Sequence, residues 1–160
     1  PGLGFSDFLR LLPFAILGIL IQSGAEELLF RGYLQQQLAA RFRSPFIWMG
    51  VPSALFAAGH YLPETFGGHA IAIVLWAFIF GGLAADLTAR TGNIGAALAL
   101  HVANNASAIL FIGLDGSLDG LALWTATVDM TGTARFALLL ATDFLVLTCA
   151  WLVARIALRR

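Results

Sequence analysis

Three charged side chains stand close together in a strongly apolar part of the chain: Glu26, Glu27 and Arg31, in the stretch EELLFR. An ionised side chain at the centre of a bilayer costs roughly 2.5 to 3.5 kcal/mol on insertion scales. Such a group therefore needs a partner or a wet cavity, and it commonly has a chemical function. The stretch indicates chemistry inside a membrane.

The spacing separates the two glutamates. Neighbouring helix residues are about 100° apart, so Glu26 and Glu27 point in different directions. Glu27 and Arg31 are four residues apart, close enough for an ion pair. Glu26 is left as the freer carboxylate and as a candidate general base for activating water. The alternative is a purely structural charge network between helices, although one buried pair would suffice for that and buried pairs rarely add stability.

Two histidines can complete such a site. His60 closes the stretch FAAGH, one turn after Phe56 on the same face. On its own it is as consistent with a hydrogen bond between helices as with catalysis. His101 and Asn105 are four residues apart and project from one helix face, roughly 6 Å apart along the axis. Side-chain donors of these types stabilise a developing oxyanion, typically by about 2.7 to 4 kcal/mol each.

The three motifs together are more specific than any one of them. EExxxR at 26–31, FxxxH at 56–60 and HxxxN at 101–105 follow one another on separate apolar helices. In this order and spacing they resemble the CPBP family, which includes type II CAAX prenyl endopeptidases and bacteriocin-processing or Abi proteins. The resemblance covers about 80 of the 160 residues.

The resemblance implies a helical intramembrane glutamate protease. By motif match, Glu26 and His60 would activate water, and His101 with Asn105 would stabilise the oxyanion. Glu27 and Arg31 would support the first glutamate. No cofactor is expected, and no position in the motifs departs from the family pattern.

Other hydrolytic chemistries have weaker support. The sequence holds no HExxH zinc helix and no aspartyl GxGD motif, and the serine in IQSG at 21–24 lacks the leading glycine of a rhomboid-like GxSG. A zinc ion held by Glu26, His60 and His101 is the second mechanism, because three nitrogen or oxygen ligands plus water suffice for catalysis.

The apolar runs predict the elements that position these groups. About 20 apolar residues span the hydrocarbon core, and 59% of the chain is hydrophobic. Candidate spans are 11–25, 44–63, 65–85, 91–114 and 136–154, and 26–40 forms a further helix. Glu27, Arg31 and Gln35 form one stripe of that helix, which should face protein rather than lipid. We expect an all-α bundle of about six transmembrane helices around an intramembrane polar cavity.

Proline and glycine mark the interruptions. Pro52 should kink the second span or end it a turn early. Residues 113–133 predict the longest loop, with a short interfacial helix over 121–128 and Trp124 at the level of the headgroups.

Charge constrains the partners and the location. Nine acidic and nine basic residues cancel, so nucleic acid is not an expected partner. All the bases are Arg, and most lie at alternate boundaries, which predicts cytoplasmic termini. The absence of Lys with abundant Ala, Gly and Arg suggests a bacterial plasma membrane.

The chain has a single cysteine, Cys149, which we interpret as a small apolar side chain without a chemical role. Residues 1–160 should form one domain, as the core of a longer protein.

The functional hypothesis is hydrolysis of a peptide bond in a membrane-associated peptide or protein, either prenylated at a CAAX-type end or of the leader or bacteriocin type. A non-catalytic scaffold or bacteriocin-immunity protein would use the same cavity to bind a partner. A small transporter subunit is less favoured, because the two halves show no repeated or broken helices. The sequence makes no prediction about oligomeric state.

Overall fold

The structure is a computed structural model and describes residues 2–114, 119–126 and 133–158. Three helical segments in these ranges are long and apolar enough to cross a membrane: Phe5–Ala39, Pro63–Thr91 and Ala134–Ala157. Two shorter apolar helical segments, Pro45–Ala58 and Gly95–Phe111, lie between them in sequence. The expectation of an all-α membrane fold is confirmed. The described ranges hold five such segments, so the expected count of six is not.

The difference lies in the first segment. Helix α1 (Phe5–Glu27), the π-helix η1 (Leu28–Leu34) and α2 (Gln35–Ala39) follow one another without a break. Glu27 and Leu28 both keep right-handed helical backbone angles. The span expected at 11–25 and the helix expected at 26–40 are therefore one helix, because a charged residue by itself does not end a helix.

The second segment is interrupted where proline predicts it. Helix α3 (Pro45–Trp48) ends at Met49, and α4 (Gly50–Ala58) begins directly afterwards. Pro52 has no N–H to donate to the carbonyl one turn earlier, so the continuous hydrogen-bond ladder cannot form across this point. The polypeptide then turns at Gly59 and continues into α5 (Pro63–Phe66).

Helix α6 is central to the packing. A 3-10 turn, η2 (Gly67–His69), leads into α6 (Ala70–Thr91), which contacts α4, α7 and α8. Gly92 ends α6 with φ 71°, in the left-handed region that favours glycine. Helix α7 (Gly95–Ala106) follows at once and continues as the π-helix η3 (Ser107–Phe111).

The segment after α7 differs from expectation. Strand β1 (Ile112–Leu114) pairs in parallel with β2 (Trp124–Ala126), and a 3-10 turn, η4 (Asp119–Leu121), lies between them. A helix was expected over 121–128; residues 124–126 form a strand instead, and 127 and 128 lie outside the described ranges. Trp124 and Thr125 favour extended backbone, and pairing with β1 supplies the hydrogen bonds. Helix α8 (Thr133–Ala157) matches the last expected span.

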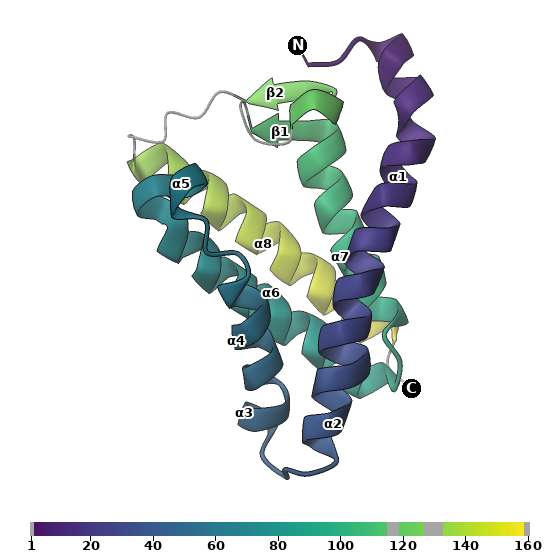
Figure 1. Cartoon of the computed structure of the whole chain (residues 1–160), viewed down its shortest axis with the longest axis vertical. Coiled ribbons are helices and arrows are strands. Elements are labelled where there is room, and N and C mark those ends of the chain that lie inside the picture. Colours follow the sequence, from purple (N-terminus) through teal and green to yellow (C-terminus); the bar gives the residue numbers. More distant parts are fainter. Residues whose placement is uncertain (1, 115–118, 127–132, 159–160) are drawn as a thin grey trace.

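Figure 1 shows two helix pairs that diverge. Helix α1 lies beside α7, and α8 lies beside α6. The pairs separate toward the end that carries the strands and α5. The main buried cluster, where the pairs meet, includes Phe56, Ala77, Phe80, Ala84 and Ala97. Many large apolar side chains of α1, α6 and α8 are exposed, as expected for helices whose solvent is lipid.

Candidate active site

A stripe of buried polar side chains attaches the first long helix to α6. Glu27, Arg31 and Gln35 are each at most 2% exposed. Arg31 Nη2 donates to the carbonyl of Gly81 at 3.2 Å, and Gln35 Nε2 donates to the carbonyl of Ala85 at 3.0 Å. The predicted i, i+4, i+8 stripe therefore faces protein. Its side chains satisfy backbone carbonyls of the neighbouring helix, an arrangement that suits a low-dielectric interior.

The ion pair predicted from the spacing is present. Arg31 Nη1 lies 3.0 Å from Glu27 Oε1, and both side chains are almost fully buried. The Arg31 guanidinium also lies 4.8 Å from the centre of the Phe56 ring, within cation–π range. The pair lies where α1 passes into the π-helix η1. Such π segments occur frequently at functional sites.

His101 connects both glutamates. Its Nδ1 lies 2.8 Å from Glu27 Oε1, and its Nε2 lies 3.6 Å from Glu26 Oε2. A carboxylate that already accepts from Arg31 can only accept from His101, so Nδ1 carries a proton and Nε2 faces Glu26. Phe56 and Phe80 flank the imidazole, with ring centres 5.8 and 4.9 Å away.

A second polar network lies on the other side of Glu26. Gln22 Nε2 donates to Glu26 Oε1, and Gln22 Oε1 accepts from Asn105 Nδ2 at 2.9 Å. Asn105 Nδ2 also donates to Ser23 Oγ at 3.2 Å, and Ser23 is fully buried. The amide therefore uses both of its N–H groups within the protein. Sequence reasoning missed Gln22, although its place one turn before Glu26 was a usable signal.

His60 occupies a separate position. It lies just beyond the end of α4, and its Nδ1 is 2.9 Å from the Phe56 carbonyl. Its ring lies 4.6 Å from that of Phe56, which also contacts His101. Among the described residues, no hydrogen bond or ion pair joins His60 to Glu26. The carbonyls in the last turn of a helix lack intrahelical partners. In α4 the Phe56 carbonyl therefore accepts a hydrogen bond from the His60 ring. Of the expected catalytic residues, Glu26, His101 and Asn105 are joined by ion-pair and hydrogen-bond contacts, whereas His60 is linked to His101 through the Phe56 ring.

The three residues suggested as zinc ligands, Glu26, His60 and His101, are not arranged around a common metal position. In the part of the chain that the structure describes, no three His, Cys, Asp or Glu side chains are placed to hold a metal ion. Glu26 and His101 are close, but His60 turns to its own helix backbone. We therefore derive no step through a metal.

An apolar groove of about 430 Å³ opens where the two helix pairs diverge. Its walls come mainly from α6, α7, η3 and α8, with single residues of α5, β1 and β2, and its larger side chains include Trp76, Phe136 and the carboxylate Asp143. Trp76 stacks on Phe80, which packs against His101. Asn104 lines the groove and bonds to Asn105 at 3.4 Å. The groove is thus linked by direct contacts to the polar site.

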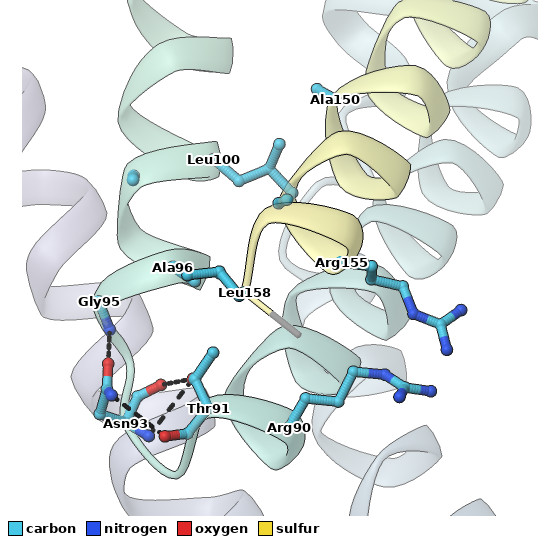
Figure 2. Close-up of a pocket in the computed structure, with 11 residues that line it drawn as sticks. Arg90, Thr91, Asn93, Gly95, Ala96, Leu100, Ala150, Arg155 and Leu158 are labelled. Atoms are coloured by element: carbon cyan, nitrogen blue, oxygen red, sulfur yellow. Dashed lines mark hydrogen bonds between the residues drawn. The ribbon is translucent and has the colours of Figure 1, made fainter. Parts of the chain in front are cut away.

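A second cavity, of about 910 Å³, lies at the opposite ends of α6 and α8. Figure 2 shows Arg90 and Arg155 extending in the same direction, while Asn93 bonds to Thr91 and Gly95 in the turn before α7. Asp86 contacts both arginines, with N–O distances of 2.8 and 3.5 Å. The Asp86–Arg155 contact attaches α6 to α8, and the cavity wall carries no histidine or carboxylate.

Comparisons with known proteins place these residues in a family context. The model of the family described as type II CAAX prenyl endopeptidase Rce1-like matches residues 8–107. That range includes all of the side chains in the polar site. The chain is also 34% identical over 120 residues to "Uncharacterized protein YyaK" of Bacillus subtilis (strain 168), covering 72% of this chain and 38% of that relative. No solved structure matches.

Proposed function

Because the chain belongs to the Rce1-like family of type II CAAX prenyl endopeptidases, we propose that it is an intramembrane endopeptidase in which Glu26 activates water. The observation that carries this proposal is the approach of Glu26 Oε2 to His101 Nε2 at 3.6 Å. Asn105 projects from the next turn of the helix that carries His101. A base and two oxyanion donors therefore share one side of a membrane helix bundle.

The reaction begins with proton transfer from a water molecule to Glu26 Oε2. The water oxygen attacks the peptide carbonyl carbon, and the carbonyl oxygen becomes an oxyanion. The C–N bond then breaks, and the proton held by Glu26 passes to the leaving nitrogen, giving a carboxylic acid and an amine. His60 would assist Glu26 through its Nε2, because its Nδ1 is engaged by the Phe56 carbonyl.

The two proposed oxyanion donors, His101 and Asn105, can donate only in particular protonation and hydrogen-bonding states. With Nδ1 bonded to Glu27, His101 donates through Nε2 only as an imidazolium. Asn105 uses both N–H groups in the resting site, so the oxyanion would displace Ser23 Oγ as an acceptor while the bond to Gln22 Oε1 remains. The exchange replaces a bond to a neutral hydroxyl by a stronger, charge-assisted bond to the oxyanion, which favours the transition state.

The substrate in this proposal is a membrane-associated peptide or protein. The apolar groove would hold its lipidated or hydrophobic part, because Trp76 and Phe136 line a space of about 430 Å³. Prenylated CAAX-type ends and leader or bacteriocin-type peptides both fit this description. The chain spans about two fifths of the length of its relative YyaK, so the substrate of the whole protein is part of the proposal.

The test is cleavage of fluorogenic peptides, with and without a farnesyl cysteine, by purified protein in proteoliposomes. We expect Glu26→Gln to abolish turnover and exhaustive chelation to leave it intact. Loss on chelation with recovery on adding zinc would instead support the metal mechanism. Retained turnover in Glu26→Gln would contradict the role of Glu26. A cellular phenotype that survives Glu26→Gln would support the scaffold or immunity alternative.

A further inference from the structure

We infer that Gln22 is a positioning residue for this reaction, which holds Glu26 and Asn105 in fixed relation across the α1–α7 contact. The inference rests on the proposed function. The geometry comes from one side chain that bonds to both residues. Gln22 Nε2 donates to Glu26 Oε1, and Gln22 Oε1 accepts from Asn105 Nδ2 at 2.9 Å.

The two hydrogen bonds by which Gln22 bridges Glu26 and Asn105 need a side chain with both a donor and an acceptor. An ionised carboxylate only accepts hydrogen bonds, and the Asn105 amide nitrogen only donates. A residue between them must therefore donate at one end and accept at the other, as a primary amide does. Gln22 lies one turn before Glu26 on the same helix face, so its side chain is long enough to reach both partners. Leucine has a similar volume but neither group.

The bridge selects which oxygen of Glu26 reacts. Oε1 is held by Gln22, whereas Oε2 is buried without a hydrogen-bond partner in the described structure and faces His101. Without Gln22 the carboxylate can rotate, and Asn105 keeps Ser23 as its remaining acceptor. Small misplacements of reacting groups reduce rates by about 100-fold. The effect should fall on the chemical step rather than on substrate binding.

The experiment compares Gln22→Leu, Gln22→Glu and Gln37→Leu in proteoliposomes. Gln37 is the matched control, since it is an exposed glutamine of the same long helix whose side chain bonds to Arg41. We expect Gln22→Leu to lower kcat by about 10- to 100-fold with KM within twofold. Gln37→Leu should match the wild type. Equal kinetics of Gln22→Leu and Gln37→Leu would overturn the inference.

A pH profile separates positioning from packing. A protonated glutamate at position 22 has one O–H donor and one carbonyl acceptor, the same pattern as the amide. The deficit of Gln22→Glu should therefore shrink as pH falls, while that of Gln22→Leu stays constant relative to the wild type. A Gln22→Glu deficit that is independent of pH would contradict the bridge.

Infrared spectra test the geometry without turnover. The chain has three glutamates, so with ¹³C-carboxyl glutamate the Glu26 band is identified by its loss in Glu26→Gln. We expect Gln22→Leu, but not Gln37→Leu, to shift that band. An unshifted band would refute the bridge whether or not a substrate is known. If Glu26→Gln still cleaves peptide, the proposed function fails; if only the Gln22 variants are normal, this inference alone fails.

Discussion

Glu27 and Glu26 differ in solvation although they are adjacent. Glu27 is fully buried, and its Oε1 accepts hydrogen bonds from both Arg31 and His101. The Glu26 side chain is 30% exposed and keeps one oxygen for His101. Glu26 Oε2 has no hydrogen-bond partner in the described structure, which supports its proposed role in proton transfer, while Glu27 holds the imidazole of His101. In the proposed mechanism these two roles require two carboxylates, which would give a physical reason for the EE pair.

Removing Arg31 should destabilise the fold strongly. Arg31→Met leaves Glu27 buried without its cation, and breaking a buried pair typically costs about 3 to 5 kcal/mol. We expect a large fall in the thermal unfolding temperature in detergent micelles. Arg10→Met is the control, because the Arg10–Asp7 pair is exposed and such pairs contribute little. Similar unfolding temperatures for the two variants would show that the buried Arg31 does not stabilise the fold.

Helix-scale features divide into those that local sequence determines and those that tertiary contacts determine. The Glu27–Arg31 pair and the interruption near Pro52 follow from spacing and proline chemistry, and both are present. The continuity of α1 into η1 does not, because charged residues suit a helix interior and a helix end equally. The β1–β2 pairing joins residues 12 positions apart, and nothing in the local pattern identifies such partners.

The geometry of the polar site also depends partly on local residue spacing and partly on how the helices pack. The i, i+4 rule places His101 and Asn105 on one face of α7. It cannot say which glutamate each of them meets, since that depends on how α1 packs against α7. The Gln22 bridge comes from that packing, whereas the His60 bond to the Phe56 carbonyl forms at the end of α4 itself. Sequence therefore predicts most of the residues that meet in this polar site but not their connections.

The close approach of α4 to α6 depends on Gly81. A Cβ at Gly81 would lie 2.9 Å from Ser53 Cβ, so one helix must move. Gly81→Ala should cost about 1 to 3 kcal/mol and lower peptide cleavage, because the Gly81 carbonyl accepts from Arg31. Gly82→Ala is the control, since nothing lies within 4 Å of its added carbon. Unfolding in detergent and turnover should both separate the two variants; equal values would contradict the steric argument.

The whole molecule has two chemically different ends. The groove and α5 lie at one end of α6 and α8, and Arg90 and Arg155 lie at the other. The turn after α2 lies at the arginine end in Figure 1. Arginine-rich boundaries favour the cytoplasmic side. The proposed orientation therefore places the groove toward the outer side of the membrane and gives a substrate access from that side. In Figure 1, α1 begins at the groove end and α8 ends at the arginine end. This orientation thus puts the start of α1 on the outer side and the end of α8 on the cytoplasmic side, which differs from the cytoplasmic location expected for both termini.

Cysteine labelling tests this orientation. In a Cys149→Ala background, we expect Thr65→Cys, in α5, to react with a membrane-impermeant maleimide added to intact cells. Ala40→Cys, in the turn after α2, should react only after the membrane is permeabilised. Both original side chains are exposed, so each position is open to the reagent once it reaches that side. The reverse pattern would place the groove toward the cytoplasm and would favour substrates that carry their lipid on a cytoplasmic C-terminal end.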